Sequence, residues 1–287
     1  MEYNFTTGAE LLSLCHSHKL PISQVMKLRE KEYSGKSFSE IDEILKIKLE
    51  IMKESAFTPL KNPQKSMGGL LGGEGKAMYE SSPLCGSMLQ KALAYAMAVL
   101  EVNASMGLIV AAPTAGASGV LPGVLFALAE EKNLQNNQLY EGLTTASAVG
   151  YLAMRHASVS GAEAGCQAEV GVASAMAAAS VVELCGGTPP QALHAASFAL
   201  SNLLGLVCDP IGGLVEAPCQ TRNAIGVSNA FTSAQLAWAG IVPVIPFDEM
   251  LTVMYQVGCA LPCSLRETAL GGCATAPSAS AFSISPQ

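Results

Sequence analysis

Apolar positions recur at helical spacing along most of this chain. Between residues 39 and 52, charged residues separate apolar positions about one turn apart, Ile41, Ile44, Leu45, Ile47 and Leu49, which predicts an amphipathic helix. The segments 86–103, 138–155 and 166–185 are apolar on nearly every side, which predicts helices buried among other helices. No strand-like alternation persists. The pattern predicts a mainly α protein, a compact multi-helix domain whose buried helices are rich in small residues.

Composition divides the chain into four parts. Residues 1–62 predict charged helices that pack on the core, and residues 81–273 predict the helical core itself. Between them, residues 63–80 contain MGGLLGGEGK, which we expect to be a mobile glycine-rich loop or an active-site lid. This loop departs from the phosphate-binding pattern GxxxxGK[ST] at Leu70 and Ala77. The uncharged segment 274–287 predicts a flexible tail.

Charge and hydropathy exclude several classes of protein. Half of the 287 residues are apolar and only 14% are charged, so disorder is excluded, and a net charge of −7 argues against binding nucleic acid. Residues 66–287 hold only six of the 16 Lys and Arg, which predicts a surface that packs against a partner. A mean hydropathy of +0.34 leaves a membrane protein as an alternative. The best candidate span, 106–129, is interrupted by prolines and glycines, so we expect no membrane segment.

The nine cysteines provide the candidate chemistry. The N-terminus lacks the features of a secretion signal, so these thiols predict a reducing compartment, the cytoplasm. Cys166, Cys208 and Cys219 lie among glycine, proline and other small residues, and a turn between residues 208 and 219 can bring two thiols together. They are candidate ligands of a metal or small buried core residues. Cys259 and Cys263 lie one helical turn apart, but no second pair supports a zinc site.

Four segments make the sequence recognisable. These are PTAGASGVLPG (113–123), SGAEAGCQAEVG (160–171), GLVCDPIGGLVEAPCQTRNAIG (205–226) and RETALGG (266–272). Together they resemble the alpha chain of iron–sulfur-dependent L-serine dehydratase, and the similarity covers nearly the whole chain. The resemblance implies a [4Fe–4S] cluster on Cys166, Cys208 and Cys219, with one iron left open as a Lewis acid. It also implies conversion of L-serine to pyruvate and ammonia by α,β-elimination, without pyridoxal phosphate.

Substrate recognition is predicted from the scarcity of cations near these cysteines. We expect backbone N–H groups of 114–119 and 160–161 to bind the substrate carboxylate. The candidate substrate-binding residues are Thr114, Gly116, Ser118, Gly119, Ser160, Gly161, Arg222 and Asn223. For Arg222 an ion pair with Glu216 is an equal alternative to substrate binding. For Asn223 the alternative is a structural role, hydrogen bonding to backbone groups at the end of a helix. Arg266, beside Glu267, is expected to be structural.

The sequence identifies no catalytic base. Ser118, Ser160 and His156 are candidates, and the base can also come from another chain. Members of the resembled family are either one long polypeptide or an alpha chain with a beta chain. We expect this sequence to be the alpha part alone, with no further domain at either end, which implies a beta subunit and a higher oligomer.

Three interpretations compete with the serine dehydratase. A related [4Fe–4S] enzyme, L-cysteine desulfidase, would use the same open iron. A non-catalytic subunit would bind a cluster or zinc while its partner holds the active site, and a membrane protein is the third. Some single-chain relatives place a C-terminal cysteine on the open iron. Cys273 is the last cysteine here, and we expect its position to be incidental.

Overall fold

Helices build the whole of the described structure. The computed structural model describes residues 2–282, and among these it has twelve α-helices and no strand, which confirms the mainly α prediction. The helices are α1 (Gly8–His18), α2 (Ile22–Ser34), α3 (Phe38–Lys61), α4 (Glu74–Glu80), α5 (Ser87–Ala104), α6 (Val120–Lys132), α7 (Asn136–His156), α8 (Gly161–Ala164), α9 (Val172–Leu184), α10 (Pro189–Asn202), α11 (Cys219–Trp238) and α12 (Phe247–Ala260). Short turns of 3-10 or π helix connect several of them.

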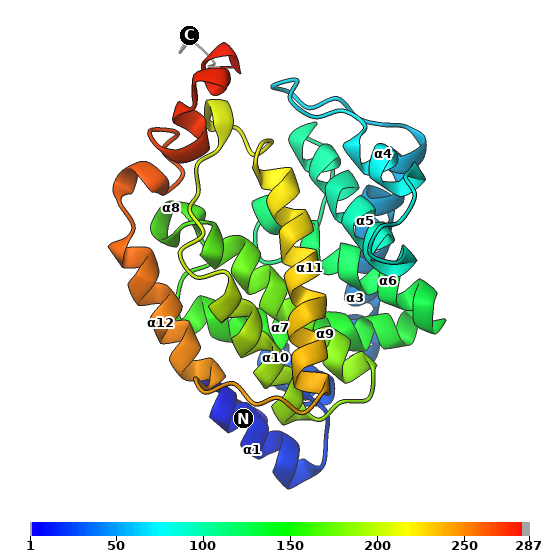
Figure 1. Ribbon diagram of the computed structural model, residues 1–287. Coiled ribbons are helices and arrows are strands. Elements are labelled where there is room, and N and C mark those ends of the chain that lie inside the picture. The colour runs from blue at the N-terminus through cyan, green and yellow to red at the C-terminus, as the bar shows by residue number, and fades with distance from the viewer. Residues whose placement is uncertain (1, 283–287) are drawn as a thin grey trace.

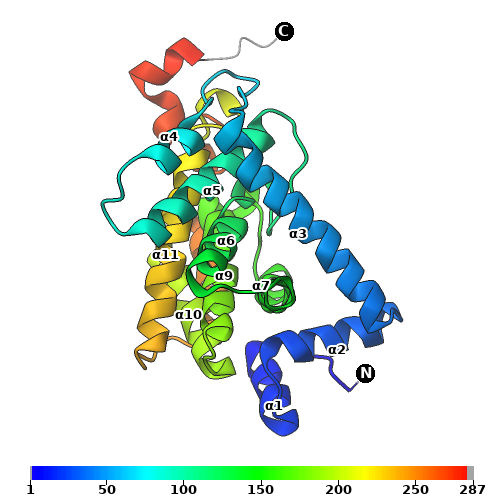
Figure 2. The same ribbon diagram turned by 90° about the vertical axis from the view of Figure 1, so that its right-hand side faces the viewer.

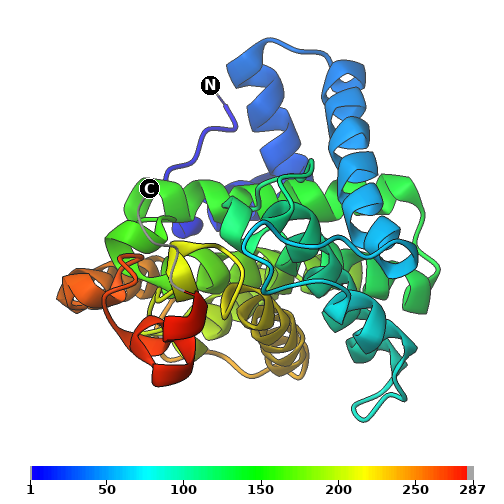
Figure 3. The same ribbon diagram turned by 90° about the horizontal axis from the view of Figure 1, so that it is seen from above.

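The N-terminal helices begin where the sequence predicts them. Thr7 accepts the amide of Glu10 and caps α1, and Pro21 precedes α2. Ser37 and Glu40 form a reciprocal capping box that starts α3. This helix continues through Pro59 to Lys61, well past residue 52, and Pro59 is buried. Figures 2 and 3 show α2 and α3 on one side of the body, where most of their charged residues stay in contact with water, although Arg29 is buried.

Helix α9 lies at the centre of the core. It is buried from Val172 to Val182, and it packs against α6, α7, α10 and α11 (Figure 1). Small residues permit the close approach of neighbouring helices. A Cβ on Gly119, at the start of α6, would lie 2.3 Å from the carbonyl oxygen of Ala96 in α5. The alanine- and glycine-rich composition therefore reflects helix packing.

Three boundaries differ from the predicted ones. The glycine-rich segment is a loop only as far as Gly73, because α4 begins at Glu74. Apolar positions at helical spacing from Leu193 to Val207 predict a helix up to Cys208, but the helix that starts at Pro189 ends at Asn202. Residues 272–275 and 277–282, expected within or beside a flexible tail, form 3-10 turns, while residues 283–287 lie outside the described part.

No helix in residues 2–282 combines the length and the apolar character that a membrane span requires.

Candidate metal and substrate site

The three cysteines of interest come from three separate elements. Cys166 precedes η2 (Gln167–Gly171), a π-helical turn that leads into α9. Cys208 lies in the connection after α10, and Cys219 is the first residue of α11. All three are buried, with exposed fractions of 3%, 3% and 6%. Helix ends from distant parts of the sequence therefore bring these cysteines to one end of the bundle.

Gln167 fixes the connection that carries Cys208. Its side chain accepts the amide of Gly205 at 2.9 Å and donates to the carbonyl of Met254 at 2.8 Å. Its own amide donates to the carbonyl of Leu206 at 3.0 Å. Gly165 has a φ of +76°, and a Cβ there would lie 2.7 Å from the same carbonyl, so glycine permits this approach.

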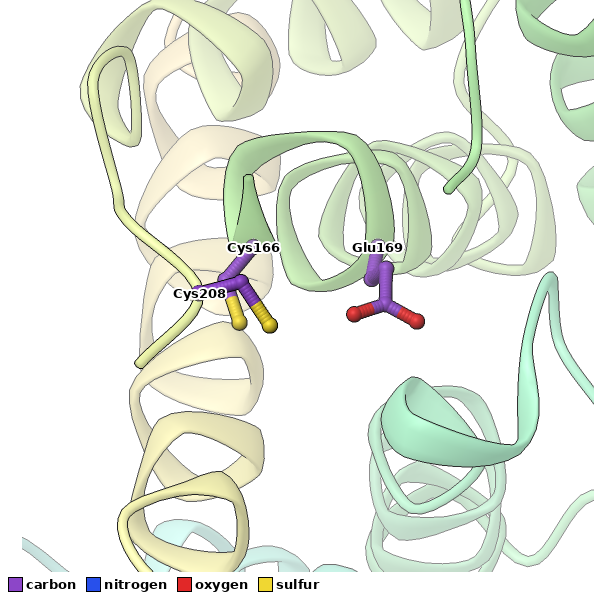
Figure 4. Close-up of side chains that lie close together, drawn as sticks. All are labelled: Cys166, Glu169 and Cys208. Atoms are coloured by element: carbon purple, nitrogen blue, oxygen red, sulfur yellow. The ribbon is translucent and has the colours of Figure 1, made fainter. Parts of the chain in front are cut away.

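Two of the thiols form a group with a carboxylate. The ligand atoms of Cys166, Cys208 and Glu169 all lie within 4.8 Å of one another, and their side chains leave their elements on the same side (Figure 4). A hydrogen bond from Cys208 lowers the pKa of Cys166, and the same bond raises the pKa of Cys208. Burial raises the pKa of Cys219 to about 12, and the charge on Cys166 adds to this effect. Cys219 is outside the 4.8 Å group but is electrostatically coupled to both other thiols.

Glu169 is the residue that sequence analysis missed. It lies in η2, three residues after Cys166, and that spacing puts two side chains on one face of a helix. The spacing was therefore the signal that could have found it. Its Oε1 accepts a hydrogen bond from the Thr114 hydroxyl at 2.7 Å. Burial raises the pKa of Glu169.

Two glycines make room for this carboxylate. A Cβ on Gly161 would lie 2.5 Å from Oε2 of Glu169 and 3.1 Å from the sulfur of Cys208. A Cβ on Gly116 would lie 3.3 Å from Oε1. Thr114, Gly116 and Gly161, all predicted to bind substrate, thus lie at the thiols and Glu169. Ser160 directly precedes Gly161, and its amide donates to the Ser158 hydroxyl at 3.1 Å.

Arg222 pairs with a different carboxylate from the one considered in the sequence. Its Nη1 lies 2.6 Å from Oδ1 of Asp209, donates to the Val207 carbonyl at 2.8 Å and lies 3.8 Å from the sulfur of Cys166. The suggested pairing with Glu216 is therefore wrong. Arg222 connects Cys166 to the connection that carries Cys208, because Asp209 is the next residue.

Glu216 instead holds the glycine-rich loop. Its buried carboxylate accepts the Ser66 hydroxyl at 2.7 Å and the amides of Gly68 and Leu70 at 2.6 and 3.0 Å. These amides are therefore occupied by a carboxylate of the chain itself. The loop is tied to the segment that leads to Cys219.

Asn223 holds the turn that begins α6. Its Nδ2 donates to the carbonyls of Gly116 and Cys219 at 2.8 and 2.9 Å, and its Oδ1 accepts the amide of Gly119 at 3.1 Å. Asn223 is fully buried, so it satisfies a helix end, as one of its two predicted roles required. In the same turn the Ser118 hydroxyl is buried and has no hydrogen-bond partner among residues 2–282.

Other candidate residues lie elsewhere. The ring of His156 is exposed and contacts the Thr6 carbonyl. Cys259 and Cys263 are exposed and do not appear in a metal-binding group within the described residues. Arg266 donates to the Glu163 carbonyl at 3.2 Å, a structural role. Cys273, treated as incidental, donates its amide to Asp209 at 2.6 Å and so lies beside the Arg222 pair.

The donors present fit an iron–sulfur cluster. Thiolates are the usual ligands of these clusters. None of the nine cysteines forms a disulfide within residues 2–282, and three of them are buried together at the end of the bundle. The fold and this site define an all-helical protein with a buried, thiol-rich centre suited to a metal cofactor.

Comparison with known proteins gives the family. The serine dehydratase alpha chain family matches residues 17–274, so the chain belongs to this family. It is 43% identical to the probable L-serine dehydratase, alpha chain, of Bacillus subtilis over 277 residues, 95% of this chain and 92% of that one. The alpha chain of L-serine dehydratase from Peptoniphilus asaccharolyticus is 44% identical, with 93% of each chain covered. The L-serine dehydratase of Helicobacter pylori is 37% identical, and the match covers 62% of its length.

Proposed function

We propose that this protein is the catalytic alpha chain of an L-serine dehydratase that converts L-serine to pyruvate and ammonia. Cys166, Cys208 and Cys219 would hold a [4Fe–4S] cluster. The observation that carries the proposal is the convergence of three buried thiols near Gly116 and Gly161 in a member of this family. The names of its alpha-chain relatives support L-serine as the substrate.

The elimination requires a Lewis acid for the departing hydroxide, donors for the substrate carboxylate and a base for the α-proton. Residues of this chain can hold the first and supply the second. The bound cluster supplies a Lewis-acid iron that stabilises the departing hydroxide. Earlier amides of the turn 114–119 and the amide of Gly161 would bind the substrate carboxylate. The predicted amides of Ser118 and Gly119 do not take part, because they donate to Ala115 and Asn223, but the Ser118 hydroxyl in that turn is free within the described chain. The buried surroundings exclude water and strengthen each of these interactions. Arg222 keeps Cys166 and the Cys208 connection in register.

A second chain completes the enzyme in this proposal. Relatives that carry the name alpha chain imply a partner, and the H. pylori relative is longer than this match. Large apolar side chains lie exposed on segments next to the site, with Met106 at 77% and Leu270 at 72%. Such side chains are typical of a surface that a partner covers. A beta subunit would bind here, in a reducing cytoplasm that keeps the nine thiols free.

The decisive experiment measures cofactor and product together. Anaerobically purified holoenzyme, with both chains co-expressed, is expected to contain about four iron and four sulfide per alpha chain and to release ammonia from L-serine. Release from L-cysteine in preference to L-serine would favour the desulfidase. Turnover that survives loss of all three cysteines would place the active site in the partner.

A further inference from the structure

The two oxygens of Glu169 have unequal partners. Oε1 accepts the Thr114 hydroxyl at 2.7 Å, whereas Oε2 has no hydrogen-bond partner within residues 2–282. No lysine, arginine or histidine of the described chain forms an ion pair with this carboxylate. Arg222, the cation beside Cys166, is already paired with Asp209 at 2.6 Å. The carboxylate is therefore only half satisfied.

The surroundings of Glu169 favour a cation. Buried charges in proteins are usually paired, because an unpaired one carries a large desolvation cost. The groups facing Glu169 are the thiols of Cys166 and Cys208, the Thr114 hydroxyl and, farther off, the carboxylate of Glu267. Each of these groups is an acid or a neutral hydroxyl, and none is a cation. A positive group placed at Oε2 would stabilise the charged form of this carboxylate.

We propose that Glu169 binds the α-ammonium group of the substrate amino acid. This inference rests on the proposed function, and it adds a partner for the substrate ammonium group, for which the sequence predicted none. The carboxylate would meet the earlier amides of the turn 114–119, and the ammonium would meet Oε2 of Glu169. Thr114 belongs to that turn and also holds Oε1, so the two halves of the substrate are recognised by elements in direct contact.

The glycines around Glu169 support a ligand of small size. Gly116 and Gly161 each face one of its oxygens, and a methyl group on Gly161 would lie 2.5 Å from Oε2. An ammonium group is compact and can donate three hydrogen bonds, so it suits a narrow space next to a carboxylate. Recognition of this kind selects amino acids over hydroxy acids that lack the amine.

The test compares two partly buried glutamates of one helical segment. Glu169→Gln keeps the shape and the Thr114 hydrogen bond but removes the charge. Glu183→Gln, at the far end of α9, is the matched control, because Glu183 is also partly buried and accepts hydrogen bonds only from distant structural groups. The measurements on each anaerobic holoenzyme are kinetics, calorimetric binding of L-serine, inhibition by glycerate, and iron and sulfide content.

We expect Glu169→Gln to weaken L-serine binding roughly 10- to 100-fold, the usual loss for one charge-assisted hydrogen bond. Iron and sulfide content should stay at the wild-type level. Glycerate has a hydroxyl in place of the amine, so the wild type should prefer L-serine strongly and the variant only weakly. Glu183→Gln should leave both affinities unchanged.

Two results would overturn the inference. Unchanged L-serine affinity in Glu169→Gln would show that the carboxylate does not meet the ammonium. Loss of iron from this variant would show that Glu169 serves the metal instead. Failure of the proposed function looks different, because the wild-type holoenzyme itself would then release no ammonia from L-serine.

Discussion

The segment from η2 to α9 carries a cysteine and a glutamate at each of its ends, and the two ends differ in how these groups are satisfied. At the far end, Glu183 accepts the amides of Ile22 and Ser23 at 2.9 and 3.1 Å and the Thr145 hydroxyl at 2.8 Å. It thereby completes the start of α2. At the near end, Glu169 has Thr114 as its one hydrogen-bond partner in the described chain.

The cysteines of the two ends differ in the same way. Cys185 is half-buried, and burial raises its pKa. Cys166 is buried among a second thiol, Glu169 and Arg222. Burial of a reactive group is therefore a poor guide to function in this helix. A better guide to function is a polar group that lacks a hydrogen-bond partner and lies beside other reactive groups.

The largest effect is expected from replacing the cysteine at the near end, Cys166, with Cys185 at the far end as its control. Cys166→Ser should abolish the iron content and lower ammonia release by at least two orders of magnitude, because a hydroxyl is a poor substitute for a cluster thiolate. Cys185→Ser should retain both within about twofold. Iron analysis and turnover on matched anaerobic preparations check this. Equal iron content and equal turnover in the two variants would show that Cys166 has no functional role that Cys185 lacks.

A methyl group at the near end should be almost as damaging. Gly161→Ala would place a Cβ 2.5 Å from Glu169 and 3.1 Å from the sulfur of Cys208. We expect a loss of activity of about 100-fold, since displacing groups in an active site by about 1 Å has effects of this order. Gly171→Ala is the control, because its Cβ would meet only Leu203 at 3.8 Å. A fully active Gly161→Ala enzyme would contradict the proposed tight packing.

Removal of the charge at the far end should affect stability instead. Glu183→Gln replaces an acceptor of two amides and a hydroxyl with a group that has one acceptor atom. The expected cost is about 1–3 kcal/mol, equivalent to a few degrees in the melting temperature. Thermal unfolding monitored by circular dichroism measures it, with Glu249→Gln as the exposed control. An unchanged melting temperature would mean that Glu183 does not stabilise the start of α2.

Glu101, which is fully buried, gives the smallest effect and sharpens the rule. Glu101 accepts the amide of Gly75 at 2.8 Å, and its Oε2 has no partner among residues 2–282, but it does not belong to the thiol group. Burial raises the pKa of Glu101, so folding favours its protonated form. Its contribution to stability is complete below the unfolded pKa of about 4.3 and is lost as the pH rises through the folded pKa.

Glu101→Gln should therefore gain stability relative to the wild type as the pH rises. The gain is about 1.4 kcal/mol for each unit by which the pKa is raised. Melting temperatures of both proteins at pH 4.5 and pH 8 measure this difference. The same difference at both pH values would show that Glu101 is charged in the folded protein. Catalysis should not change in either case.

Much of the fold could be predicted from the sequence. The caps at Thr7 and Thr188, the apolar period of α3 and the uniformly apolar α9 are local signals, and each predicted helix is present. The end of α3 was missed because Pro59 usually stops a helix, whereas here it lies buried. The start of α4 was missed because glycines obscured a seven-residue helix.

The site was less accessible to sequence reasoning. The motifs identified the family and the three cysteines, which local composition had already marked as unusual. Of the two partners considered for Arg222, Glu216 was wrong, because Asp209 comes close only through the path of the connection after α10. Glu169 was overlooked because its spacing from Cys166 is visible in the sequence, but its contact with Cys208, which comes from the connection after α10, is not.

The hydrogen bonds that Glu216 accepts from Ser66, Gly68 and Leu70 join the N-terminal third of the chain to the segment that carries Cys219. Local unfolding of the segment that carries Glu216 must break its hydrogen bonds to the amides of Gly68 and Leu70. The two regions should therefore behave as a single cooperative unit in hydrogen exchange. A cofactor that steadies Cys219 would then slow the exchange of two glycine-loop amides more than 140 residues away in sequence.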